Sequence, residues 1–180
     1  RDDNDPLKHF RERFVLPAGT IYLDGNSLGV ASPAALAELE NAAKVEWAEE
    51  LIRSWNTAGW FDLPVVLGEK VGRLVGAAAG QVVVADTTSI NIYKALHAAL
   101  SLRPDRKAIV AESSSFPTDL YMAEGVVSTI PGASLRLEGV DGPILEDLID
   151  ESVAVVLVNH VNYKTGELRD MAAVTRRAHE

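Results

Sequence analysis

The stretch Val153-Ala154-Val155-Val156-Leu157-Val158 is an uninterrupted apolar run rich in β-branched residues. Two similar runs, Gln81 to Ala85 and Lys107 to Ala111, precede it in the chain. Continuous apolar runs of this length are typical of strands that are buried on both faces. Helical segments are predicted between them, at Ser89 to Leu102, Thr118 to Glu124 and Ile144 to Ile149. This alternation indicates an α/β fold with a mostly parallel sheet.

The residues before the first apolar run are predicted to be helical. A short helix or arm over Asp5 to Phe14 is ended by Pro17. Ser32-Pro33 then supplies a cap and a first-turn proline for a long helix from Ala34 to Trp55. The apolar stripe of that long helix consists of Leu36, Leu39, Ala43, Trp47 and Leu51.

A further helix is predicted from Leu63 to Val75, with Gly76 as its C-terminal cap. The segment Asn56 to Trp60 interrupts the helical pattern and is the expected domain boundary. Residues 1–55 would form an N-terminal arm and helical segment, and residues 56–180 the first part of an α/β domain.

Composition excludes several classes of protein. The chain has 180 residues and a formal net charge of -9, and it lacks the clustered cations that bind nucleic-acid phosphates. The absence of cysteine excludes disulfides and thiolate metal sites, and is compatible with a reducing cytoplasm. No apolar run approaches the roughly 20 residues that a membrane helix needs. We expect a globular, cytoplasmic chain with no nucleic-acid, membrane or metal partner.

Two polar clusters follow apolar segments near the ends of predicted elements. In Tyr22-Leu23-Asp24-Gly25-Asn26-Ser27-Leu28-Gly29, glycines bracket Asn26 and Ser27, as expected where a backbone turns tightly and approaches a ligand. In Asp86-Thr87-Thr88-Ser89-Ile90-Asn91, hydroxyl residues stand at a helix N-terminus, where free N–H groups bind phosphate. From the residues alone, a simple turn is the favoured explanation of the first cluster and a simple helix cap that of the second.

Two further polar loops follow the second and third apolar runs. Phe116-Pro117-Thr118-Asp119 opens a helix, where Asp119 would favour the helix dipole and Phe116 would belong to the core. Asn159 to Gly166 follows the third run; its His160 is expected to be packed and hydrogen-bonded rather than a catalytic base, and Thr165-Gly166 to form a turn. Because ligands bind at the carboxyl ends of parallel strands, we expect these loops to converge on one ligand.

The chain resembles the kynureninase family of pyridoxal-phosphate (PLP) enzymes, within the aspartate-aminotransferase superfamily. The resemblance is carried by Tyr22 to Gly29, by Ser115-Phe116-Pro117-Thr118-Asp119-Leu120-Tyr121 and by Val161 to Met171, in this order, and it runs from about Leu16 to Glu180. It implies a PLP-dependent transferase-like large domain, mostly parallel sheet with flanking helices, preceded by a helical N-terminal segment and incomplete here.

The resemblance also implies a set of PLP contacts. Phe116 would stack on the pyridine ring, because an aromatic ring in offset geometry suits a flat heteroaromatic. Asp119 would be a polar neighbour of the cofactor, and Asn159 would face it near the 3'-oxygen. The complete set comprises Thr88 and Ser89 on the phosphate, together with Phe116, Pro117, Thr118, Asp119 and Asn159.

By the same resemblance, the whole enzyme would hydrolyse L-kynurenine, or 3-hydroxykynurenine, to anthranilate or 3-hydroxyanthranilate and L-alanine, in tryptophan catabolism and NAD biosynthesis. Asn26, Ser27, Trp55 and Asn56 would form a substrate wall, although Trp55 equally well ends the helical stripe and is buried. The family is commonly homodimeric, and the arm around Phe10 and Phe14 would cross to the partner.

Lys164 is rejected as the lysine that forms a Schiff base with PLP. In the family that lysine follows a later strand in a Ser-x-Lys-Tyr-type segment, and the aspartate of the pyridine nitrogen lies in an Asp-Leu-x-His segment; this chain has neither. The chain stops at Glu180, within a predicted amphipathic helix that has no capping glycine or proline. We predict a fragment of a longer enzyme, with the lysine beyond Glu180 and no catalytic residue in the fragment itself.

Three alternatives stay open at this point. The chain could be a complete, non-catalytic PLP-binding or scaffold domain, or a purely structural α/β module. It could also belong to a related PLP lyase such as a cysteine desulfurase, which shares the fold. The motifs at Tyr22 to Gly29 and Phe116 to Tyr121 favour the kynureninase family over the last of these.

Overall fold

The computed structural model of the chain describes residues 4–139 and 142–180. The chain divides into two units, Arg1–Val84 and Ala85–Glu180. All fully buried apolar side chains among the described residues belong to the second unit. The second unit therefore holds the hydrophobic core.

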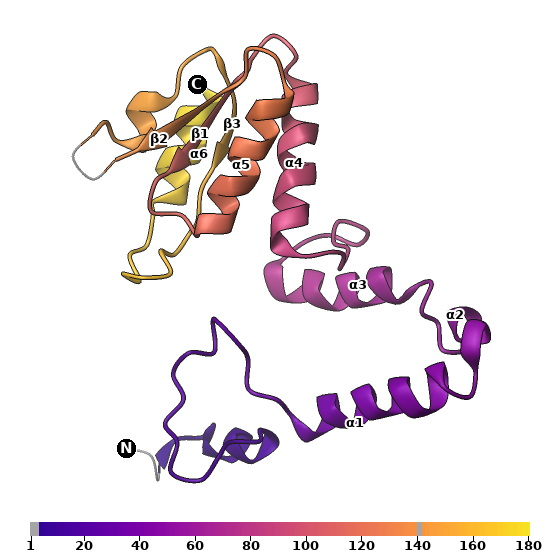
Figure 1. The fold of residues 1–180 in the computed structure, drawn as a ribbon. Coiled ribbons are helices and arrows are strands. Elements are labelled where there is room, and N and C mark those ends of the chain that lie inside the picture. The colour runs from indigo at the N-terminus through magenta and orange to yellow at the C-terminus, as the bar shows by residue number, and fades with distance from the viewer. Residues whose placement is uncertain (1–3, 140–141) are drawn as a thin grey trace. The chain divides into compact units, whose positions relative to one another are not determined.

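A parallel sheet of three strands forms the centre of the second unit (Figure 1). β1 (Ala108–Glu112) lies between β2 (Ser134–Glu138) and β3 (Val153–Leu157), and both neighbours run parallel to it. The register places Glu112 opposite Glu138 and Ala111 opposite Leu157. The predicted α/β class with a parallel sheet is confirmed for this unit.

Successive residues of β1 point to opposite faces of the sheet, and each face carries its own cluster. On one face Ile109 packs against α4 (Thr88–Leu102) and α5 (Pro117–Thr129), through Leu96, Leu100, Ala123 and Val126. On the other face, Ala108 and Val110 pack with Val153, with the 3-10 helix η5 (Leu145–Leu148) and with α6 (Met171–His179). Helices thus cover both faces, which explains the continuous apolar run in β1.

Most predicted elements of the second unit are confirmed with small shifts of their ends. β1 and β3 occupy the second and third apolar runs, and α4 begins one residue before its prediction. α5 is longer than predicted, and the expected helix at Ile144 to Ile149 is the 3-10 helix η5. Burial on both faces holds for β1, whereas most residues of β3 are only half-buried.

β2 was missed because its sequence alternates, Ser134-Leu135-Arg136-Leu137-Glu138, in contrast to the continuous apolar runs. An alternating pattern is typical of a strand with one solvated face. β2 has β1 as its neighbour on one side, at the edge of the described sheet.

The strand predicted at Gln81 to Ala85 is wrong. These residues have no strand conformation, and Val83 and Val84 are exposed. The segment runs beside α3 (Leu63–Val75), where the Val84 amide donates to the Pro64 carbonyl at 3.1 Å. A strand needs a partner strand for its backbone groups, and the described residues supply none here.

The first unit consists of short helical pieces. These are η2 (Lys8–Arg13), α1 (Pro33–Asn41), the π-helix η3 (Ala42–Trp47), η4 (Leu51–Arg53), α2 (Ser54–Thr57) and α3. The Ser32 hydroxyl caps α1 by accepting from the Ala35 amide at 3.1 Å, and α3 ends at Gly76 with φ +72°, both as predicted.

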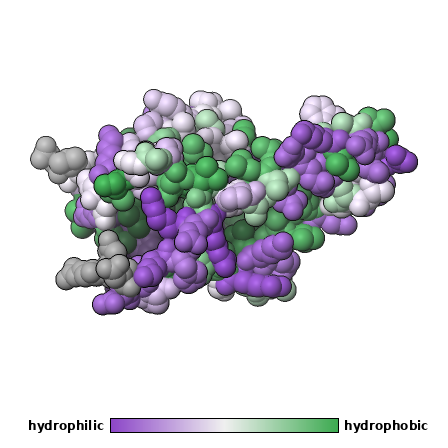
Figure 2. All heavy atoms as spheres, turned by 90° about the horizontal axis from the view of Figure 1, so that it is seen from below, coloured by the Kyte–Doolittle hydropathy of each residue, from purple (hydrophilic) through white to green (hydrophobic). Residues whose placement is uncertain are grey.

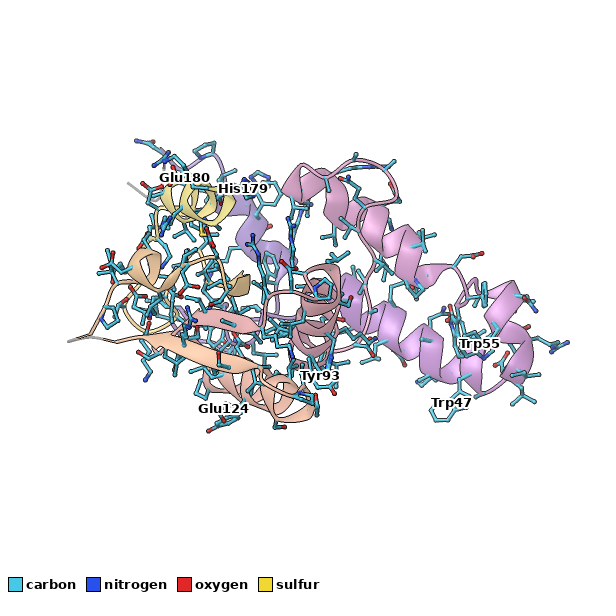
Figure 3. All side chains as sticks on the ribbon, turned by 90° about the horizontal axis from the view of Figure 1, so that it is seen from above. Trp47, Trp55, Tyr93, Glu124, His179 and Glu180 are labelled. Carbon is cyan, nitrogen blue, oxygen red and sulfur yellow. The ribbon has the colours of Figure 1, made fainter. Side chains whose placement is uncertain are left out.

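The single long helix predicted over Ala34 to Trp55 is wrong. The helix changes to π geometry at Ala42 and breaks at Leu51, which has φ +55°. The predicted apolar stripe is exposed at Leu36, Leu39, Trp47 and Leu51, and Trp47 projects from the ribbon (Figure 3). Without apolar packing along its stripe, the segment does not have the interaction that usually stabilises a long amphipathic helix.

The predicted domain boundary near residue 55 concerns the domains of the whole fold and stays a prediction. Within the described residues, the division into units lies between Val84 and Ala85.

Many large apolar side chains are exposed, among them Ile21, Leu23 and Leu74. Figure 2 shows hydrophobic residues on the face of the molecule that it presents. No helix of the described residues is long and apolar enough to cross a membrane.

Gly68 is the position in α3 where a side chain would be costly. A Cβ built there would lie 2.7 Å from the Val82 carbonyl carbon and closer still to its oxygen, whereas one at Gly72 would lie 3.5 Å from Val82 Cγ2. We predict that Gly68→Ala lowers the free energy of unfolding of the first unit by about 1–3 kcal/mol, because the backbone must move.

Urea unfolding followed by tryptophan fluorescence measures this effect, because Trp47, Trp55 and Trp60 all lie in the first unit. Gly72→Ala is the matched control, expected to be neutral or to stabilise by up to about 1 kcal/mol through helix propensity. Equal effects of the two substitutions would contradict the close approach of Val82 to α3.

Candidate ligand site at the carboxyl end of the sheet

The carboxyl ends of β1 and β3 and the N-termini of α4 and α5 lie at the same end of the second unit (Figure 1). For α5 this follows from the parallel order of the strands, because α5 begins just after the carboxyl end of β1. No strand precedes α4 within the described residues, so its place rests on the structure alone. The loops that carry the predicted cofactor residues therefore leave from one edge. The predicted cofactor residues at this end of the second unit are Thr88, Ser89, Phe116, Pro117, Thr118, Asp119 and Asn159.

Phe116 stands at the N-cap of α5 and is 49% exposed. Its ring lies edge-on to the ring of Tyr163, with centroids 5.1 Å apart and an interplanar angle of 64°. The prediction from the residues alone that Phe116 would belong to the core is wrong. The side chain is therefore accessible to a flat ligand, and Tyr163, which had no role in the sequence-based prediction, fixes the orientation of its ring.

Asp119 is the buried acid of the site. It lies in the first turn of α5 and is only 7% exposed. Burial raises the pKa of its carboxyl, and a side-chain hydrogen bond with Asn159 partly offsets this by lowering it. Asn159 Nδ2 also donates to Ser115 Oγ at 3.4 Å. Asp119, Asn159 and Ser115 thus form one polar cluster beside the loop that carries Phe116.

The turn into α4 is held rigidly. Thr87 caps the helix by accepting from the Ile90 amide at 3.4 Å, and Asn91 Nδ2 donates to the Ala85 carbonyl at 2.7 Å. Asp86 has φ +49° and forms an ion pair with Lys94. Aspartate is among the few residues that tolerate this left-handed conformation.

The amides of Thr88 and Ser89 have no acceptor within the described residues. They are the first donors of α4, next to the positive end of the helix dipole. Two hydroxyl groups on the same residues add donors that can rotate toward an anion. The donor set suits a phosphate group, which needs several N–H and O–H donors at close range.

The loop after β3 folds around Asn162. Its Oδ1 accepts from the amides of Lys164 and Thr165, and its Nδ2 donates to Ser114 Oγ at 3.1 Å. The predicted turn at Thr165-Gly166 is confirmed by Gly166 with φ +72°. His160 is exposed, so its predicted packing is wrong, and Lys164 lies over the Tyr163 ring at 5.6 Å.

A charged cluster of Arg169, Glu112 and Glu138 lies at the carboxyl ends of β1 and β2. Arg169 pairs through Nε with Glu112 and through Nη2 with Glu138 Oε2 at 2.6 Å. Burial lowers the pKa of Arg169, but its two carboxylate partners outweigh this and the net pKa is raised. An open cavity of about 280 Å³ lies beside the cluster. The sequence signal that could have pointed to this cluster is an acid, Glu112, directly after the apolar run Lys107 to Ala111.

The substrate residues predicted at Asn26 and Ser27 lie in a turn of the first unit. The Ser27 amide donates to the Asp24 carbonyl at 3.1 Å, and Tyr22 Oη donates to the carbonyls of Asp24 and Leu28. Gly25 and Gly29 have neither positive φ nor a neighbour within 4 Å of a built Cβ. No atom of the described chain requires glycine at these two positions, and the predicted approach to a ligand stays a prediction.

Trp55 and Asn56 lie in α2. Within the first unit, Trp55 is half exposed and meets Trp60 edge-on at 6.3 Å (Figure 3 marks Trp55). Its predicted burial against the domain stays a prediction. Trp60 Nε1 donates to Glu46 Oε2 at 2.7 Å, which fixes the pair to η3. Asn56 is exposed.

Comparison with known proteins gives one consistent result. The chain is 51% identical over 185 residues to a protein named kynureninase from Pseudomonas fluorescens, a match that covers 99% of this chain and 44% of that protein. It is 49% identical over 180 residues to the kynureninase of Burkholderia pseudomallei strain 1106a. The chain is homologous to kynureninases along nearly its whole length. The resemblance stated from the three motifs is confirmed.

The kynureninase of Burkholderia mallei strain SAVP1 is 48% identical over 180 residues. The chain spans less than half the length of the curated kynureninases that it matches. No family profile matches the chain. The roles of individual site residues stay predictions, because a shared name and a percentage identity do not assign them.

Asp119 provides a test of the site's electrostatics. Its folded-state pKa is raised, so ionisation disfavours folding once the pH exceeds the unfolded value of about 3.9. We predict that Asp119→Asn raises the free energy of unfolding at pH 7, and that the difference from the original chain disappears below about pH 4, where Asp119 is protonated in both states.

Urea titrations followed by far-ultraviolet circular dichroism at a series of pH values measure the difference. Glu124→Gln, on the exposed face of the same helix, is the control and should change stability little at any pH (Figure 3 marks Glu124). A loss of stability in Asp119→Asn at pH 7 would show that the carboxylate is stabilised in the folded state.

Proposed function

We propose that the chain is part of a PLP-dependent kynureninase that hydrolyses L-kynurenine to anthranilate and L-alanine. The observation that carries this proposal is the identity of about half of the residues with kynureninases over 97–99% of the chain. In the balanced reaction, the Cβ–Cγ bond breaks, water supplies the hydroxyl of the new carboxyl group, and Cβ gains a proton.

The residues at the carboxyl end of the sheet fit PLP by their chemistry. The N-terminus of α4, with Thr88 and Ser89, would hold the phosphate, and the exposed Phe116 ring would stack on the pyridine. Pro117 and Thr118 begin α5 and so fix the direction in which the ring projects. Asp119 and Asn159, which hydrogen-bond each other, would contact the polar edge of the ring.

When bound, PLP withdraws electrons from the substrate Cα, which makes the adjacent bonds labile. The described residues bind and orient rather than transfer protons to the substrate. The lysine that anchors PLP is proposed to lie outside this chain. Asn26, Ser27, Trp55 and Asn56 remain proposed substrate contacts, and a cytoplasmic homodimer remains the proposed assembly.

The activity is tested with the native protein in which this chain occurs, loaded with PLP. Release of fluorescent anthranilate from L-kynurenine, with an equal amount of alanine, supports the proposal. The same assay with 3-hydroxykynurenine determines the preferred substrate. PLP binding without product from either substrate would favour a non-catalytic PLP-binding protein, and cysteine desulfuration would favour a related lyase.

The phosphate contacts give a sharper prediction. The double variant Thr88→Val, Ser89→Ala should weaken PLP binding at least roughly 100-fold, because each of the two lost hydrogen bonds to a charged group contributes about 1.5–3 kcal/mol. Binding is not abolished, because the backbone amides remain. The dissociation constant is measured by PLP absorbance titration. Ser101→Ala is the control, since Ser101 lies in the last turn of the same helix and its hydroxyl bonds the Ala98 carbonyl.

Unchanged PLP affinity in the double variant would contradict the assignment of the phosphate to α4. An equal loss in Ser101→Ala would show that the loss comes from a weakened helix rather than from lost contacts.

A further inference from the structure

Arg169 connects two carboxylates that stand at the ends of neighbouring strands. Glu112 ends β1 and Glu138 ends β2, and the two are direct partners in the register of the sheet. Their side chains are 9% and 19% exposed, and that of Arg169 is 22% exposed. Two acids opposite each other on adjacent strands repel, and burial strengthens the repulsion. Arg169 lies between them and supplies the positive charge that offsets this repulsion.

Each carboxylate uses its second oxygen to hold a backbone amide. Glu112 Oε2 accepts from the Asn159 amide at 3.3 Å, and Glu138 Oε1 accepts from the Leu145 amide at 3.1 Å. The position of Glu112 therefore sets the position of the Asn159 backbone, at the end of β3. Arg169 fixes Glu112 from the other side.

Asn159 in turn reaches the ligand-facing part of the site. Its side chain hydrogen-bonds Asp119 and donates to Ser115 Oγ. A continuous series of contacts thus runs from Arg169 through Glu112 and Asn159 to Asp119. The side-chain hydrogen bonds of Arg169 go to the two glutamates, so its side chain reaches the cofactor residues through Glu112. The Arg169 amide also donates to the His160 carbonyl at 3.0 Å, a main-chain contact that a change of the side chain leaves in place.

We propose that Arg169 is a positioning residue of the cofactor site: it holds Glu112 so that this carboxylate fixes Asn159, and through Asn159 it orients the polar edge of the site toward PLP. The positioning of Asn159 stands on the contacts alone, and the effect on PLP rests on the proposed function. Removal of Arg169 leaves the buried Glu112 and the half-buried Glu138 facing each other without a positive partner, so that Glu112 turns away and the Asn159 amide loses its acceptor.

Two measurements on the native protein test the proposal. Amide hydrogen exchange reports whether Asn159 is held, and PLP titration with visible circular dichroism reports cofactor affinity and orientation. Arg169→Met should speed exchange of the Asn159 amide at least about tenfold, weaken PLP binding at least about tenfold and reduce the cofactor's dichroic band. Arg169→Lys keeps the charge with fewer donors and should lie between Arg169→Met and the original protein.

Two further variants separate positioning from general destabilisation. Arg136→Met breaks an exposed ion pair with Asp150 in the same sheet and should leave both readouts within about twofold of the original protein. Glu112→Gln added to Arg169→Met removes one of the two unpaired charges, and with it the repulsion between the strand partners, but keeps an oxygen for the Asn159 amide. This double variant should recover part of the lost protection and of the lost PLP affinity.

The proposal is overturned if Arg169→Met leaves Asn159 exchange unchanged, or if Arg136→Met produces the same losses. It is also overturned if Asn159 is released but PLP affinity and dichroism stay the same, because Asn159 would then not orient the cofactor. If the original protein does not bind PLP, the proposed function fails, and hydrogen exchange still decides whether Arg169 holds Asn159.

Discussion

Burial of β1 on both faces is the constraint on which the second unit depends. Ile109 on one face and Ala108 and Val110 on the other require two separate apolar layers, and these are supplied by α4 with α5 and by η5 with α6. Parallel pairing with β2 and β3 then aligns the three carboxyl ends at one edge. The loops that begin at Ser113 and Asn159 must leave from that edge, and so do the polar groups that they carry.

The alignment of the strand ends places charged side chains where they are largely shielded from solvent, and a charged group in such a place needs a partner. Glu112 and Glu138 are tolerated because Arg169 pairs with both and backbone amides take the remaining oxygens. Asp119 has a neutral partner, Asn159, which only partly offsets the effect of burial, and the pKa of Asp119 is raised as a result. The edge of the sheet therefore combines the ion-pair cluster of Arg169, Glu112 and Glu138 with one acid, Asp119, whose ionisation is disfavoured. Acids with a shifted pKa are common in ligand sites.

The first unit has the opposite character. Its helices present apolar side chains to the surface, and none of its described apolar side chains is fully buried. Sequence patterns in this unit predicted helices correctly where the signal was local, as at the Ser32 cap and the Gly76 end. They failed for the long helix, which breaks at Leu51, and for the strand at Gln81 to Ala85. Both elements need a packing or pairing partner, and the described residues provide none.

The sequence by itself determined the α/β class, the positions of β1, β3, α3 and α4, and the relation to kynureninases, because apolar periodicity, helix caps and motifs are properties of neighbouring residues. The alternating strand β2 was not predicted. Only the tertiary structure decided that Tyr163 orients Phe116, that Asn159 bonds Asp119, and that Arg169 joins Glu112 to Glu138. Arg169 and Glu112 are 57 positions apart. Contacts over such separations depend on how the sheet aligns its strand ends, which no local pattern specifies.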